Sequence, residues 1–186
     1  MLRLAAIAIV FLWGQEDARS RVKETAYARA SRATTIASDP GVREAVAASD
    51  AASETPEQVR RRDTAWMANP GDPLRKAIVQ APCSARLRDL VKDDPMVVEA
   101  FVMNDRGTLV CSVAETSDYW QGDEPKWQRT FLEGRDPFVD EPAFDASTGK
   151  YAIQISVPVV SDAKRIGAVT LTLKLSRQEA GAPARQ

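Results

Sequence analysis

The sequence predicts an α+β fold, in which N-terminal helices lie across one face of an antiparallel β-sheet. Two observations lead to this prediction. The first part of the 186-residue chain carries small apolar residues at helical spacing, with charged residues between them. The second part contains two pairs of β-rich segments, and a short turn joins the members of each pair. Helices that are followed by a set of hairpins are typical of the α+β class.

The longest predicted helix covers residues 16–38. Its apolar positions are three or four residues apart, and they are Val22, Ala26, Ala30, Ala33 and Ala37. Because most of these side chains are alanine, we expect the helix to pack closely against a broad surface. Asp39-Pro40-Gly41 marks its end.

Shorter helices follow in the prediction. One covers residues 42–48, and another begins after Thr55, an N-cap residue followed by proline, and extends to Asn69. A turn-rich link then leads to a fourth helix at residues 84–91. The segments after this helix have the pattern of strands.

The predicted strands form two hairpins. The first joins residues 96–103 to residues 108–113 through a turn at Asn104-Asp105-Arg106-Gly107. The second joins residues 151–159 to residues 166–175, where alternate side chains are apolar, so one face of each strand is expected to be buried. Residues 177–186 are polar and are expected to form a disordered tail.

An apolar run, Leu4–Trp13, follows the positive charge of Arg3. At about 1.5 Å per residue it is far shorter than the roughly 30 Å hydrocarbon core of a bilayer, so it is not a complete span. We interpret residues 1–14 as an apolar export signal (a signal peptide) or a partial membrane anchor, with an ordinary apolar helix start as the alternative. Export predicts a periplasmic or other extracytoplasmic location. There Cys83 and Cys111 could form a disulfide, although their spacing leaves a free buried pair equally open.

The composition argues against an enzyme. The chain has no histidine, which excludes catalytic histidine arrangements and imidazole zinc sites. No cofactor-binding or metal-binding motif is present, so we expect neither a cofactor nor a metal. The formal net charge of −1 provides no basic surface for a nucleic acid partner. The neighbouring acids Asp118, Asp123 and Glu124 are expected to be solvated loop residues rather than a hydrolase site.

Residues 115–150 lie between the two hairpins and carry an aromatic cluster. Tyr119, Trp120 and Trp127 fall close together in a segment that also holds several carboxylates. A surface loop seldom exposes so much apolar area, whereas aromatic walls with a few polar groups are typical of a small-molecule pocket. The alternative is that Trp127 and Phe131, four residues apart, form the core face of a short helix.

Several of these segments together resemble one known family. They are Val98–Val110 with its central turn, Thr116–Trp127, Tyr151–Val159 with Ile166–Val169, and the pair Asp63 and Trp66. They resemble the bacterial extracytoplasmic Cache (PDC, PAS-like) sensor domains, over nearly the whole chain. The resemblance implies a single sensor domain at residues 15–176, with a PAS-like antiparallel sheet and long N-terminal helices packed on one face.

The resemblance also implies a function. Domains of this kind bind a small carboxylate, an amino acid or a similar metabolite outside the cytoplasm, and they report to a histidine kinase, chemoreceptor or cyclase through the membrane. The chain is therefore expected to bind a small-molecule ligand, to contribute to signal perception, and to act with a membrane-bound signalling partner.

The ligand-binding residues are expected on the aromatic segment and on the strand that faces it: Tyr119, Trp120, Trp127, Arg129, Arg135, Gln154 and Tyr151. The three first-named rings would form walls. One of the two arginines would pair with an anionic group of the ligand, because a guanidinium group matches a carboxylate. Strand parity places the glutamine and the tyrosine on opposite faces, and we favour the glutamine because a buried polar side chain needs a partner.

A non-catalytic structural or dimerisation module is the alternative function, with the pocket filled by its own side chains. The alanine-rich helix suits close helix–helix contact, so a homodimer through the N-terminal helix is a further expectation. A collapsed and fully apolar pocket would favour this alternative over ligand binding.

Overall fold

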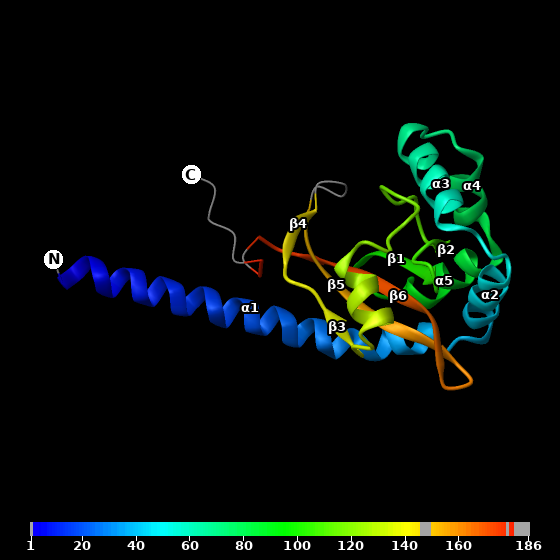
Figure 1. The fold of residues 1–186 in the computed structure, drawn as a ribbon. Coiled ribbons are helices and arrows are strands. Elements are labelled where there is room, and N and C mark those ends of the chain that lie inside the picture. The colour runs from blue at the N-terminus through cyan, green and yellow to red at the C-terminus, as the bar shows by residue number, and fades with distance from the viewer. Residues whose placement is uncertain (1, 146–149, 178, 181–186) are drawn as a thin grey trace.

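A computed structural model describes residues 2–145, 150–177 and 179–180 of the chain, and gives only the backbone course of residues 2–19 and 145. Helices come first along the chain, and a six-stranded antiparallel sheet follows (Figure 1). The predicted α+β class, with a long N-terminal helix on one face of an antiparallel sheet, is confirmed.

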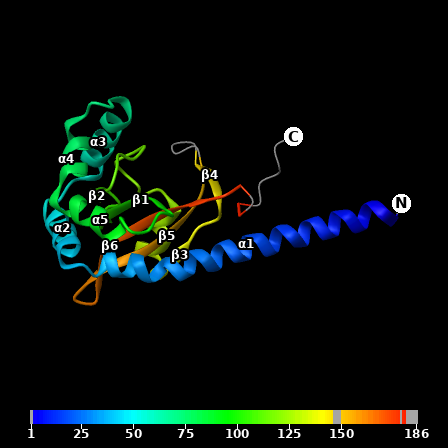
Figure 2. The same cartoon turned by 180° about the vertical axis from the view of Figure 1, so that it is seen from behind.

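The first helix, α1 (Leu2–Ala37), is much longer than the predicted helix. Its buried positions include Val22, Ala26, Ala33 and Ala37, as the spacing predicts, while Ala30 is half-buried. This part of α1 lies against strands β5 and β6, whereas the N-terminal part extends past the sheet (Figures 1 and 2). Among the described residues, no helix combines the length and the apolar character that a membrane crossing requires.

Four shorter helices follow, and each begins at a proline: α2 (Pro40–Ala51), α3 (Pro56–Ala68), α4 (Pro73–Gln80) and α5 (Pro82–Val91). Proline is favoured at the first helical position because its missing N–H would have no partner there. The Thr55 hydroxyl accepts from the Gln58 amide in a capping box, as the N-cap prediction requires.

The prediction of a turn-rich link before residue 84 was wrong, because α4 occupies most of it. The Asp72 carboxylate accepts from the Leu74 amide and caps this helix. The helix has only eight residues, so its apolar side chains are too few to show a clear period.

The sheet has the order β2-β1-β6-β5-β3, and β4 also pairs with β5. The strands are β1 (Val97–Asn104), β2 (Leu109–Ser112), β3 (Phe138–Val139), β4 (Ala143–Asp145), β5 (Lys150–Ser161) and β6 (Lys164–Leu175). All pairs are antiparallel. Both predicted hairpins, β1–β2 and β5–β6, are confirmed.

The two faces of the central strands differ in chemistry. On one face, alternate residues of β5 and β6 from Ile153 to Val159 and from Val169 to Leu175 are apolar and buried. They pack with α1, α2 and α5 in the core, where burying such a side chain stabilises the fold by about 1.5–3 kcal/mol. On the other face the same strands carry Gln154, Ser156, Thr170 and Thr172. The second face of these two strands is therefore polar along the stretch in which the first face is apolar.

Cys83 of α5 and Cys111 of β2 form a disulfide, with their Cα atoms 5.7 Å apart. The bond connects helix α5 to an edge strand of the sheet. The sequence leaves open whether the two cysteines form a disulfide or a free buried pair, and the structure shows the disulfide.

Candidate ligand-binding cavity

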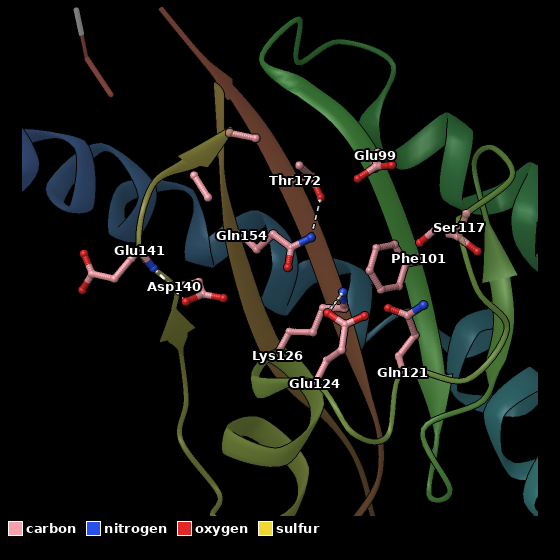
Figure 3. Close-up of a pocket in the computed structure, with 13 residues that line it drawn as sticks. Glu99, Phe101, Ser117, Gln121, Glu124, Lys126, Asp140, Glu141, Gln154 and Thr172 are labelled. Carbon is pink, nitrogen blue, oxygen red and sulfur yellow. Dashed lines mark hydrogen bonds and ion pairs between the residues drawn. The ribbon is translucent and has the colours of Figure 1, made fainter. Parts of the chain in front are cut away.

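A cavity of about 280 Å³ lies over the polar face of the sheet (Figure 3). Its lining comes from four parts of the chain: the central strands, the loop after β2, the start of α6 (Pro125–Trp127), and the β3–β4 segment. The lining residues are Glu99, Phe101, Thr116, Ser117, Gln121, Glu124, Lys126, Asp140, Glu141, Ala143, Ala152, Gln154 and Thr172.

Strand register builds the floor of this cavity. Glu99 of β1 is paired with Thr172 of β6, and Thr172 is paired with Gln154 of β5, so the three residues form one row across the sheet. The Gln154 amide nitrogen donates to the Thr172 hydroxyl over 3.3 Å. In the next row Phe101 lines the cavity, whereas the Ser156 and Thr170 hydroxyls bond to each other at 2.8 Å and do not line it. The first row therefore supplies the polar side chains of these strands that a ligand can reach.

The loop after β2 covers one side of the cavity, and helix α3 holds it in place. One carboxylate oxygen of Asp63 accepts from the amides of Tyr119 and Trp120, both at 2.9 Å. The Trp66 indole donates to the Thr116 carbonyl at 3.0 Å. Asp63 and Trp66, which carry part of the family resemblance, thus fix the backbone of this loop.

The turn between β1 and β2 also contacts the loop that follows β2. Gly107 has a φ of +76°, and a Cβ atom at this position would lie 2.5 Å from the Cα of Gly122. Its carbonyl accepts from the Gln121 amide at 2.8 Å. This close contact needs glycine at residue 107, because a side chain would push the loop away from the hairpin.

The third wall is α6, which continues into a π-helical turn, η1 (Gln128–Leu132). Lys126 projects from α6 and is 6% exposed. Its ammonium group lies 2.6 Å from a Glu124 carboxylate oxygen and 5.4 Å from the centre of the Phe101 ring. An opposite charge and an aromatic face together stabilise a lysine at this depth.

Of the seven predicted ligand-binding residues, only Gln154 belongs to the lining. The structure buries Tyr119 and Trp127 instead and leaves Trp120 half-buried. The Tyr119 hydroxyl donates to Glu54 at 2.9 Å, and burial raises the pKa of this phenol above its ordinary value. The Trp120 indole donates to the Arg106 carbonyl at 2.9 Å, and the Trp127 indole donates to the Asn104 carbonyl at 3.0 Å.

The other three predicted residues also lie elsewhere. Arg129 and Arg135 are exposed, and both pair with Glu133, at 2.5 and 3.3 Å. Tyr151 contacts the Phe144 ring and the apolar cluster on the α1 side of the sheet. Strand parity therefore distinguishes Gln154 from Tyr151 as the sequence argument expects, and ligand contact by the seven residues stays a prediction.

Apart from Gln154, the acidic and amide residues of the lining were not among the predicted site residues. Glu99 and Thr172 could have been found once Gln154 was chosen, because they share its row in the sheet. Asp140 comes from a segment between two very short strands, and no pattern in the sequence marks it.

Comparisons with known proteins identify the fold. No family model matches the chain, and neither does any curated protein sequence. Among solved structures, the sensor domain of the V. cholerae histidine kinase DctB matches 98% of this chain and 62% of its own chain, with a TM-score of 0.53 and 12% identity. This chain has the fold of a Cache sensor domain. At such low identity the match describes the fold alone.

Two chemoreceptor domains also match, with lower scores. The sensory domain of Campylobacter jejuni Tlp3 with isoleucine bound has 15% identity and a TM-score of 0.47, over 87% of this chain and 56% of that one. The Pseudomonas aeruginosa PAO1 amino acid chemoreceptor PctC in complex with GABA has 14% identity and a TM-score of 0.45, over 92% and 61%. The chain thus spans about three-fifths of the length of these Cache-fold neighbours. They are sensor domains of a kinase and of chemoreceptors, not catalytic domains.

Proposed function

We propose that this chain is an extracytoplasmic sensor domain that binds a small molecule in the cavity over the β1–β6–β5 floor and contributes to signal perception. The observation that carries the proposal is the polar lining of this cavity. Buried amide and hydroxyl groups need hydrogen-bond partners, and a ligand can supply them. The alternative, a structural module with a self-filled pocket, requires apolar filling, yet Phe101 is the only aromatic side chain in the described lining.

Two matched threonine variants test this proposal. Thr172 lines the cavity and is 1% exposed, whereas Thr170 is 0% exposed, lies two residues away on the same strand face, and does not line it. Each hydroxyl takes part in one side-chain hydrogen bond, so Thr172→Val and Thr170→Val should each cost about 1 kcal/mol of stability.

The two variants should differ in binding. A thermal-shift screen of small metabolites, followed by calorimetric titration, identifies a ligand; at 100 times its Kd, the ligand should add about 2.7 kcal/mol. Thr172→Val should then weaken binding while Thr170→Val leaves the Kd unchanged. Absence of binding by every compound, or equal effects of both variants, would contradict the assignment of the cavity.

The location is proposed on two observations. The apolar run Leu4–Trp13 favours export, and the Cys83–Cys111 disulfide is typical of an oxidising compartment. Fusing residues 1–40 to a reporter that is active only outside the cytoplasm should give activity. Activity of a purely cytoplasmic reporter in the same fusion would count against export.

A homodimer through α1 is proposed as the arrangement in which the domain signals to a membrane-bound partner. On the exposed face of this helix that carries Glu24, Ser31 and Thr34, Tyr27 is a large hydrophobic side chain that is 53% exposed, and a second copy of the helix could cover it. Sedimentation of the full chain should show a dimer, and Tyr27→Arg should shift it to a monomer. A monomer at all concentrations for the unchanged chain would exclude this arrangement.

A further inference from the structure

Among the described residues that line the cavity, carboxylates outnumber cations. Four carboxylates line it, those of Glu99, Glu124, Asp140 and Glu141, against the single ammonium group of Lys126. That ammonium group already pairs with Glu124. No arginine is among the described lining residues. A ligand that carried only carboxylates would therefore find no unpaired cation among the described lining residues.

The carboxylates lie on different walls of the cavity. Glu141 forms an ion pair with Lys23 of α1 at the rim. Asp140, from the same segment, points toward the cavity in Figure 3 and accepts the Glu141 amide at 2.8 Å. Within the described residues, Asp140 makes no ion pair. Its charge is thus available to a ligand.

The buried amide group of Gln121 presents an acceptor rather than a donor to the cavity. Gln121 is 2% exposed, and its amide nitrogen donates to the carbonyl and the carboxylate of Asp118, at 3.1 and 2.7 Å. Because both neighbours are acceptors, the carboxamide oxygen must turn the other way, and in Figure 3 it faces the cavity. Among the described residues it has no hydrogen-bond donor. An acceptor that faces the cavity in this way can take an N–H or O–H group from a ligand.

Gln154 lies on the floor of the cavity. One N–H of its amide donates to the Thr172 hydroxyl, so its carboxamide oxygen and its second N–H are left for a ligand. Two amide oxygens and the Asp140 carboxylate, from three separate walls, can thus all accept hydrogen bonds from a ligand.

We infer that the cavity takes a small organic cation with a primary ammonium group, and that Asp140, Gln121 and Gln154 accept its N–H donors. This inference rests on the proposed function and names its ligand class. At about 30 Å³ per water, the cavity has room for about nine waters, so a ligand of similar heavy-atom count fits. Charge-assisted bonds from an ammonium group to a carboxylate are about twice as strong as neutral ones.

Two other kinds of cation fit less well. A quaternary ammonium group has no N–H donors and needs an aromatic cage, whereas Phe101 is the only ring in the described lining and already faces Lys126. A metal ion needs several ligands converging on one point, and the described residues contain no such group of carboxylates or cysteines.

Three probes with the same four-carbon chain test the charge of the ligand: butane-1,4-diamine, 4-aminobutanoate and butanedioate. Calorimetric titration of the full chain should give tighter binding for the diamine than for 4-aminobutanoate by about tenfold or more, and no binding for butanedioate. Equal or tighter binding of butanedioate or 4-aminobutanoate would overturn the inference and would leave the proposed function standing.

A pair of variants tests the residue. Asp140→Asn keeps the shape of the side chain and removes its charge, so it should weaken diamine binding about tenfold. Asp123→Asn is the control, because Asp123 is exposed in the neighbouring loop and does not line the cavity. An unchanged Kd in Asp140→Asn overturns the inference.

The metabolite screen extends the test beyond these probes. Bound compounds that all carry a net positive charge support the inference. Binding confined to anions or zwitterions refutes it, and no binding by any compound refutes the proposed function as well.

Discussion

Replacing Trp127 by alanine distinguishes a ring that stabilises the domain from one that contacts ligand. The side chain is 7% exposed and stacks on Phe131, with ring centres 5.0 Å apart. Truncating a buried aromatic side chain costs about 3–5 kcal/mol. The Asn104 carbonyl loses the indole donor but keeps the Gly107 amide, so the lost bond adds only about 0.5 kcal/mol.

The expected total is therefore about 4 kcal/mol, a large part of the roughly 5–15 kcal/mol that stabilises a typical domain. Urea denaturation followed by circular dichroism measures this loss. Trp127→Phe is the companion variant, because it keeps a ring in the core and loses only the indole N–H; it should cost about 1–2 kcal/mol. Calorimetric titration of both variants should give an unchanged Kd for the folded fraction.

The opposite pattern would refute this reasoning. If Trp127→Ala abolished binding and lowered the free energy of unfolding by less than about 1 kcal/mol, the ring would be a wall of the ligand site, as the sequence predicts. Trp127→Phe would then also weaken binding, without a matching loss of stability.

Three further predictions follow from single contacts. Replacing Cys83 and Cys111 by serine should lower the free energy of unfolding by about 3–4 kcal/mol, because the disulfide closes a loop with a sequence separation of 28. A calorimetric melt under non-reducing conditions measures this loss, and an unchanged melting temperature would contradict the prediction. Asp63→Ala removes the acceptor for two loop amides and should cost about 3 kcal/mol and expose the loop to proteolysis, whereas Asp63→Asn, which retains an acceptor, should cost less. Burial raises the pKa of Asp50 from 3.8 to about 6, and the nearby Asp105 carboxylate adds to this effect. Between about pH 4 and pH 6 the folded state therefore binds a proton that the unfolded state does not, so the free energy of unfolding should fall as the pH rises through this range. The fall should be only about 1 kcal/mol after solvent screening and should be absent in Asp50→Asn; an equal fall in both proteins would contradict this assignment.

The strands could be predicted from the sequence because their periodicity reports burial directly. In β6, apolar residues from Val169 to Leu175 alternate with Thr170, Thr172 and Lys174, and the structure buries the apolar set against α1, α2 and α5. The buried positions of α1 could be predicted from its apolar periodicity for the same reason. Helix α4 was missed because two turns flanked by proline carry little periodic signal.

The lining of the cavity could not be predicted in the same way. A sequence pattern indicates which side chains are buried, but it does not indicate what they face. The indole N–H groups of Trp120 and Trp127 donate to the backbone carbonyls of Arg106 and Asn104, so both have partners within the domain and neither ring lines the cavity. Asp140 and Glu99 come together only through strand register and through the course of the β3–β4 segment.

Strand β6 has a mechanical consequence for the whole domain. Thr172 lines the cavity, and its neighbour Leu173 packs in the cluster that includes Val22 and Ala26 of α1. A ligand that displaced this strand would therefore also displace the residues that contact α1. Helix α1 would amplify such a displacement. From Val22 to Leu2 it runs about 30 Å beyond its seat on the sheet, so a tilt of about 5° at the seat would swing its far end by about 3 Å.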